Sequence, residues 1–83
     1  MDYEHIELEE AKRQLALSKL QDMLLEEIEM YLSEMKSIAE YATSNELSAE
    51  GSDRLNGRMK EMQKSIQALE TRLLLSKQST ILQ

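Results

Sequence analysis

The sequence contains no cysteine and no proline, has only two glycines, and lacks valine, phenylalanine and tryptophan. Without cysteine the chain can form neither a disulfide framework nor a thiolate metal site. Without valine and the larger aromatic residues it lacks the usual signature of β-strands. Alanine, leucine, glutamate, lysine, glutamine and methionine dominate instead, and all of them favour helices. The composition therefore predicts an all-α protein, and 83 residues make at most one small domain.

The sequence also lacks a long apolar run and a basic N-terminus. No segment approaches the roughly 20 apolar residues that span a bilayer. The residues from Met1 to His5 are acidic, where a signal peptide would be basic. A net charge of −6 argues against binding to nucleic-acid phosphates or to anionic membrane surfaces. We therefore expect a cytoplasmic protein that binds neither nucleic acid nor a membrane.

Apolar residues recur in two matching series, each with the 4-3-4-3-4 spacing of a coiled-coil seam. The first series is Leu24, Ile28, Tyr31, Met35, Ile38 and Ala42, and the second is Leu55, Met59, Met62, Ile66, Leu69 and Leu73. The residue numbers of facing pairs always add to 97, from 24 with 73 to 42 with 55. Two antiparallel helices in register require such a constant sum. The pattern predicts an antiparallel two-helix coiled-coil hairpin with a long first helix.

The ends of the two helices follow from capping signals. Asn45 is expected to close the first helix in a left-handed conformation. Ser48 and Ser52 compete as the cap of the second helix, and we favour Ser48 because Leu55 already keeps the seam register. The single domain 1–83 then has four parts: a first helix over about 3–43, a turn over about 44–48, a second helix over about 49–77, and a tail over 78–83.

The two halves of the hairpin differ in charge. Residues 1–45 carry eleven acidic and four basic side chains, whereas residues 46–83 carry five acidic and six basic ones. Opposite signs on the two arms favour their pairing. Glu27 with Arg72 is the expected ion pair, although an exposed pair contributes only about 0–1 kcal/mol.

The first helix carries more apolar surface than the second can cover. Leu25, Leu32 and Ala39 lie beside the seam and face polar residues, and residues 3–20 extend past the second helix by roughly 25 Å. A two-helix hairpin cannot bury this surface alone, so assembly into a larger helical bundle is expected. Methionine is flexible and suits surfaces that accept partner helices. The predicted partner-binding residues are Leu17, Leu20, Met23, Leu25, Met30, Leu32 and Ala39.

Candidate chemistry is sparse. His5 is the only histidine, and with Asp2 and Glu9 on its helix face it is expected to be solvated rather than a metal ligand. The glutamate clusters lack the loop or the Glu-x-x-His spacing of calcium and di-metal sites. No serine has the histidine and aspartate partners of a catalytic triad, and no glycine-rich phosphate-binding loop occurs. The sequence therefore predicts no enzyme, no metal site and no cofactor.

Three stretches resemble the long helical hairpin near the start of bacterial flagellins: Leu25 to Ala39, Glu46 to Leu55, and Met62 to Leu69. In flagellins the second arm begins with a similar Leu-Ser-x-x-Asp-Arg pattern. The matching positions are Ile28, Leu32, Ile38, Ala39, Leu47, Ser48, Asp53, Arg54, Ile66 and Leu69. The resemblance implies a helical hairpin that takes part in filament-like assembly.

In size, acidity and cytosolic character the chain is also similar to small helical-hairpin chaperones and co-chaperones of type III secretion. That likeness implies a protein that covers an apolar helix of a partner. The sequence thus favours a non-enzymatic protein–protein interaction module, such as a small secretion-type chaperone or co-chaperone. The alternative is a self-assembling structural subunit, either a flagellin-like filament or a coiled-coil oligomer. The expected partner is another helical protein or a copy of the chain itself.

Overall fold

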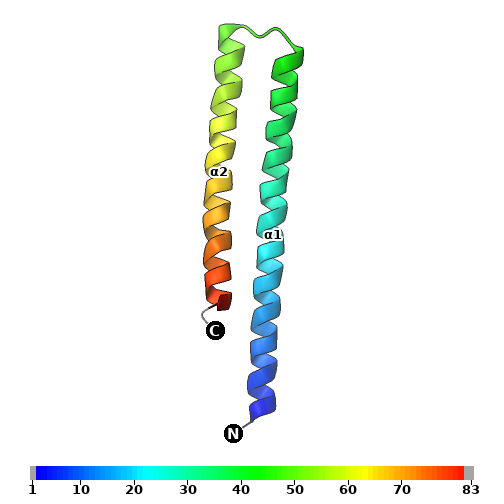
Figure 1. The fold of residues 1–83 in the computed structure, drawn as a ribbon, viewed down its shortest axis with the longest axis vertical. Coiled ribbons are helices and arrows are strands. Elements are labelled where there is room, and N and C mark those ends of the chain that lie inside the picture. The colour runs from blue at the N-terminus through cyan, green and yellow to red at the C-terminus, as the bar shows by residue number, and fades with distance from the viewer. Residues whose placement is uncertain (1, 82–83) are drawn as a thin grey trace.

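The chain forms a hairpin of two antiparallel helices. A computed structural model describes residues 2–81, with α1 at Tyr3–Ser44 and α2 at Ala49–Ile81. The helices lie side by side, and α1 extends well past the end of α2 (Figure 1). The molecule measures 70 × 17 × 13 Å along its principal axes. The predicted all-α hairpin with a long first helix is confirmed.

Both helices begin with a side chain that caps the backbone. Asp2 is extended, and its carboxylate accepts a hydrogen bond from the backbone N–H of His5 at 3.1 Å. The hydroxyl oxygen of Ser48 accepts a hydrogen bond from the backbone N–H of Gly51 at 3.0 Å. Each cap satisfies a backbone donor that has no partner within the first helical turn. The choice of Ser48 over Ser52 is therefore correct.

The prediction that Asn45 closes α1 in a left-handed conformation is wrong. Asn45 is extended, with φ −128° and ψ 142°. Its side-chain amide instead donates to the backbone carbonyl of Tyr41 at 2.9 Å. The hydroxyl of Thr43 donates to the carbonyl of Glu40, also at 2.9 Å. Both side chains thus bond to carbonyls in the last turns of α1, while the backbone leaves the helix in an extended conformation.

The second helix is longer than predicted. It continues through Ile81 rather than ending near Lys77, so most of the expected tail is helical, and residues 82–83 lie outside the described part. Neither glycine nor proline follows Gly57 in the sequence. Contact with α1 also continues, because Ser76 is only 6% exposed. The last predicted seam residue is therefore not the last one that packs.

Ser76 is a seam position that the apolar pattern missed. Its number and that of half-buried Gln21 add to 97, as for the apolar pairs. Its hydroxyl donates to the backbone carbonyl of Leu73 at 2.7 Å, which lowers the cost of burying a polar side chain. The heptad spacing alone could have identified Ser76, because it lies three residues after Leu73.

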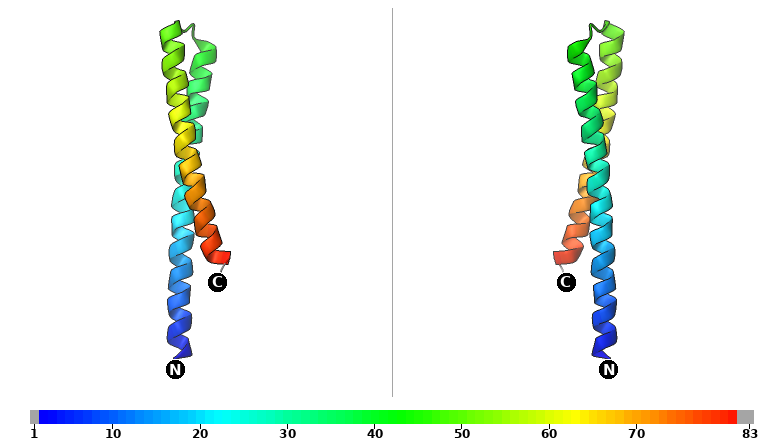
Figure 2. Two further views of the ribbon diagram at one scale, coloured as in Figure 1. Left: turned by 90° about the vertical axis from the view of Figure 1, so that its left-hand side faces the viewer. Right: turned by 90° about the vertical axis from the view of Figure 1, so that its right-hand side faces the viewer.

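The core is a narrow line of side chains between the helices. Leu24, Met62, Ile66 and Leu69 are its buried hydrophobic members. The other predicted seam residues are half-buried, except Ala42, which is exposed. Ala42 has a short side chain two residues before the end of α1, and Leu47 of the loop lies near Leu55 there instead. The two helices cross as they run along each other (Figure 2), as heptad spacing requires.

The expected ion pair between Glu27 and Arg72 does not form. Within residues 2–81 the ion pairs are Glu9 with Lys12 at 3.6 Å and Glu10 with Arg13 at 3.1 Å. Both lie inside α1 and are exposed. Two long side chains must lose rotamer freedom to meet across the hairpin, and solvent screens what they gain. The apolar seam, rather than charge pairing, therefore sets the register.

The register leads to a crosslinking prediction. Cysteines introduced at Ile38 and Met59 should form a disulfide readily under mild oxidation, because these positions face each other across the seam. Cysteines at Ile38 and Ile66 should not, since position 66 lies about two helical turns further along α2. Gel mobility without reducing agent measures both yields. Equal yields would contradict the register.

Candidate functional site

Apolar residues of α1 outside the seam form two rows, which lie on opposite sides of α2 where α2 runs alongside. The leucine row occupies two adjacent positions of the seven-residue repeat and consists of Leu8, Ala11, Leu15, Leu25, Leu32 and Ala39. The methionine row consists of Leu20, Met23 and Met30. At 3.6 residues per turn, Met23 and Leu25 project about 160° apart around the helix, and Leu25 and Met30 about 140° apart. α2 covers the middle of the predicted apolar arc and separates its two edges.

The predicted partner-binding residues therefore do not form one surface. In the leucine row Leu25 is 44% exposed, Leu32 is 52% exposed, and Ala39 is also exposed. In the methionine row Met23 is 57% exposed and Met30 is 65% exposed. The sequence analysis predicted a single arc, because the sequence does not show which part of that arc α2 covers.

Leu17 and Leu20 are half-buried against the end of α2. They line a shallow hollow with Arg72, Leu75 and Ser76. Leu75 is itself 57% exposed and was not predicted as a contact residue. Leu20 thus connects the methionine row to an apolar side chain on the second helix.

The first part of α1 has no helix of this chain alongside it in the described structure. The seam register places Ile81, the last residue of α2, opposite residue 16. Residues 3–15, here called the overhang, therefore extend past α2 by about 20 Å. The overhang is shorter than the predicted 3–20 because α2 is longer than predicted. It carries exposed Tyr3, Ile6, Leu8 and Leu15.

Local side-chain pairs support the overhang. The carboxylate of Glu10 accepts hydrogen bonds from Gln14 at 3.1 Å and from Arg13 at 3.1 and 3.3 Å. The hydrogen bond from Gln14, followed by the bond and charge of Arg13, lowers the pKa of the Glu10 carboxyl below its ordinary value. Pairs three and four residues apart favour helix formation. They bury no apolar surface, so they leave the leucines of the overhang in solvent.

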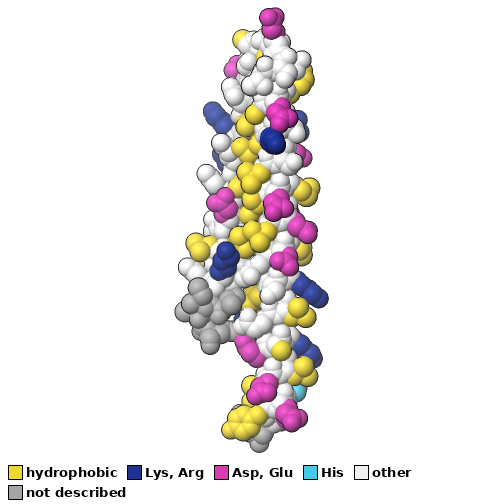
Figure 3. All heavy atoms as spheres, turned by 45° about the vertical axis from the view of Figure 1, so that its right-hand side comes forward, with side chains coloured by type: hydrophobic (Ala, Val, Ile, Leu, Met, Phe, Trp, Pro, Cys, Tyr) yellow, Lys and Arg dark blue, Asp and Glu magenta, His cyan; other side chains and the backbone are white. Residues whose placement is uncertain are grey.

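Figure 3 shows how apolar and acidic side chains share one face of the molecule. Hydrophobic side chains follow the line where α1 and α2 meet, and others lie among acidic side chains on α1 beyond the end of α2. On this face, acidic and basic side chains therefore flank the apolar line of the seam, and apolar side chains continue beyond the end of α2.

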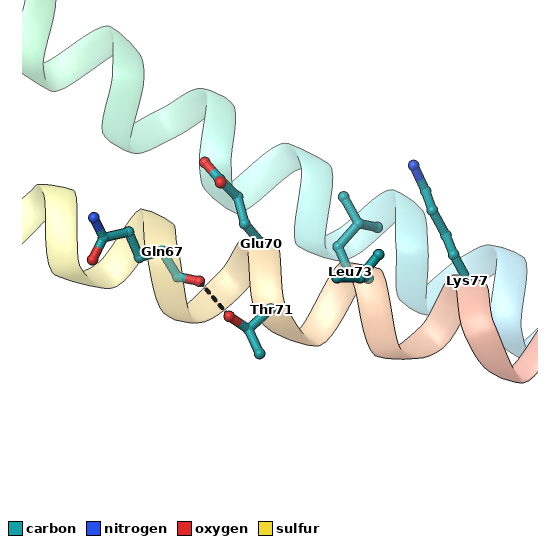
Figure 4. Close-up of a pocket in the computed structure, with 6 residues that line it drawn as sticks. Gln67, Glu70, Thr71, Leu73 and Lys77 are labelled. Carbon is teal, nitrogen blue, oxygen red and sulfur yellow. Dashed lines mark hydrogen bonds between the residues drawn. The ribbon is translucent and has the colours of Figure 1, made fainter.

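The described hollows lie along the surfaces of the helices. Figure 4 shows one formed by α2 alone, in which the hydroxyl of Thr71 donates to the backbone carbonyl of Gln67 at 3.0 Å. Glu70 and Lys77 also line it, two helical turns apart, and form no ion pair with each other. Among residues 2–81 no three histidine or acidic side chains lie close enough together to hold a metal ion.

Comparisons with known proteins add no constraint. No helix within residues 2–81 is both long and apolar enough to cross a membrane. No family model, no curated protein and no solved structure matches the chain. Its function must therefore be argued from the exposed rows of α1.

Proposed function

We propose that this chain is a non-enzymatic helical interaction module whose first helix binds an apolar helix of another protein. One observation carries the proposal. Among the residues whose burial the structure describes, eleven large hydrophobic side chains are exposed, and nine of them lie on α1. Contiguous exposed apolar surface on a small protein marks an interaction site. A row of such residues along a helix suits a partner that is itself an amphipathic helix.

The methionine row is the surface that we assign to the partner helix. Methionine side chains are flexible and polarisable, so they adapt to partners of different shape. Met23 and Met30 lie one heptad apart, and Leu20 links them to Leu75 on α2. A partner helix lying along this edge would contact both arms of the hairpin.

The charge of α1 indicates which charge the partner helix should carry beside its apolar face. Residues 1–45 carry eleven acidic side chains against four basic ones. Complementary charge mainly sets specificity and the rate of association. A partner helix with lysine or arginine beside its apolar face should therefore be preferred to one with glutamate there.

In a cell such a module would act as a small secretion-type chaperone or co-chaperone that covers an apolar helix of a subunit before assembly. The alternative, a self-assembling structural subunit, is favoured by the exposed leucines that continue onto the overhang. Sedimentation over a concentration series separates the two. A filament-type subunit should grow without limit as concentration rises, whereas a chaperone should stay at a small, fixed size.

Synthetic amphipathic peptides test the proposal directly. A helical peptide with leucines at heptad spacing and lysine flanks should bind the chain in a fluorescence anisotropy titration. Met30→Glu should weaken that binding about tenfold or more, because it places a charge in the apolar contact. Ser33→Glu, which adds the same charge on α1 outside both rows, is the matched control and should change little.

Two results would contradict the proposal. One is a failure of the lysine-flanked peptide to bind better than its sequence-scrambled version. The other is an equal effect of Met30→Glu and Ser33→Glu, which would show that the methionine row makes no specific contact.

A further inference from the structure

The four leucines of the leucine row have a symmetric spacing. Leu8, Leu15, Leu25 and Leu32 are separated by 7, 10 and 7 residues, so the pattern reads the same in both directions about residue 20. All four are exposed, from 44% for Leu25 to 56% for Leu15. We propose that a second copy of the chain packs antiparallel against this row and forms a closed two-fold dimer. The inference rests on the proposed function, because it assigns one row of the interaction module to self-pairing.

The symmetric spacing makes the row self-complementary. In an antiparallel pair of α1 helices centred at residue 20, the numbers of facing residues add to 40. Leu8 then faces Leu32 of the second copy, and Leu15 faces Leu25 of the second copy. The two-fold axis repeats both contacts, so every leucine of the row meets a leucine. An interface of one surface patch with itself requires this complementarity.

Charge within the same stripe selects the antiparallel orientation. Asp22 and Glu29 occupy the stripe between and beside the leucines. A parallel pair would set each acidic residue against its own copy, and like charges at facing positions are destabilising. In the antiparallel register Asp22 faces Ser18 and Glu29 faces Ala11 of the second copy. Both acidic residues between and beside the leucines therefore meet a small side chain, and Glu4 in the same stripe faces Lys36 of the second copy.

The side chains on the outer flank of the leucine row change from positive to negative charge at the same centre. Lys12 and Lys19 lie on this flank before residue 20, and Glu26 and Glu40 lie on it afterwards. The antiparallel register places Lys12 of one copy beside Glu26 of the other, twice per dimer. Lys12 now pairs with Glu9 at 3.6 Å. Because solvent screens this exposed pair, Lys12 can leave Glu9 for Glu26 of the second copy at little energetic cost. The same register places Lys19 beside Lys19 of the second copy, so one like-charge contact stands against the two contacts of Lys12 with Glu26. On balance, charge favours the register that the leucine spacing indicates.

The dimer also covers the overhang. Residues 8–15 of each copy lie against residues 25–32 of the other, so the part of α1 without α2 alongside gains a neighbour. Two-fold symmetry closes the assembly at two chains, because each leucine row is fully used. The methionine row points away from this contact and stays open to a partner helix.

A disulfide experiment tests the register in the full-length chain, which has no cysteine of its own. The double variant Leu15→Cys with Leu25→Cys should yield a covalent dimer under mild oxidation. Positions 15 and 25 of one chain lie about 15 Å apart along α1, so they cannot bridge to each other. The single variant Leu25→Cys should stay monomeric on the same gel. A strong covalent dimer of the single variant would instead demonstrate the parallel arrangement and overturn the proposal.

Sedimentation equilibrium tests the energetics. The wild-type chain should reach a limiting mass of two protomers, and Leu25→Glu should weaken the dimer about tenfold or more. Lys12→Glu should also weaken it, and the double variant Lys12→Glu with Glu26→Lys should restore it. Circular dichroism at the same concentrations checks that each variant stays helical.

The methionine row provides the control that separates this proposal from the proposed function. Met30→Glu should leave the dimer intact while it weakens binding of the lysine-flanked peptide about tenfold or more. A wild-type chain that stays monomeric at high concentration overturns the dimer but not peptide binding. A dimer that forms without any peptide binding overturns the proposed function but not the dimer.

Discussion

Replacing Ile66 by alanine should lower the free energy of unfolding by about 2–5 kcal/mol. Ile66 is 7% exposed and lies at the centre of the seam on α2, opposite Tyr31. The substitution removes buried apolar surface and leaves a cavity that two straight helices cannot close, because neighbouring seam residues hold them apart. A small domain has a total stability of only about 5–15 kcal/mol, so much of the fold is lost with this one side chain.

Urea unfolding followed by circular dichroism measures the effect. Leu74→Ala is the matched control, since Leu74 is 58% exposed on the same helix. This substitution should lower the free energy of unfolding by only about 0.5–1 kcal/mol. Both variants should be compared at one protein concentration, because self-association would add to the apparent stability. If the two substitutions cost the same, the seam does not hold the hairpin together.

Hydrogen exchange should reveal a large difference in stability along α1. At low protein concentration, amides from Ile6 to Leu15 should exchange about a thousandfold faster than those from Ile28 to Ile38, a difference of about 4 kcal/mol. The second segment packs against α2, whereas the first has only local side-chain pairs. An isolated helix of that length is marginal in water, because its nucleation is costly.

Raising the protein concentration should protect the overhang strongly if a second copy covers it. Leu25→Glu should remove this added protection and leave the exchange of Ile28 to Ile38 almost unchanged. Mass spectrometry of peptides from both segments gives the two rates in one experiment. Equal protection of both segments in a proven monomer would contradict the prediction, since it would require a contact within one chain that covers the overhang.

The sequence alone determined the architecture of this protein. Heptad spacing fixes which residues of a helix share a face, and a constant sum of 97 fixes how two such faces align. Both depend only on the order of residues along the chain, so the hairpin, its register and the Ser48 cap could all be predicted. The same arithmetic extends to Ser76, which was missed only because serine is not apolar.

Details that depend on competing local contacts were less predictable. Asn45 was expected in a left-handed conformation, but it is extended, and its side chain donates to the carbonyl of Tyr41. Glu27 and Arg72 were expected to pair, yet the energy of an exposed pair is too small to order two long side chains. The end of α2 depended on continued contact with α1, which the composition of the tail does not reveal.

Only the tertiary structure decided which apolar residues of α1 remain in solvent and how they are grouped. Leu25 and Met23 are two residues apart in the sequence, but α2 lies between the surfaces that they occupy. A pattern of hydrophobic residues predicts that a face will be covered. It cannot say how much of that face one partner helix covers, because the answer depends on the width and length of that helix. Here α2 is narrow and shorter than α1, and it leaves the leucines and methionines beside the seam, as well as the overhang, in solvent.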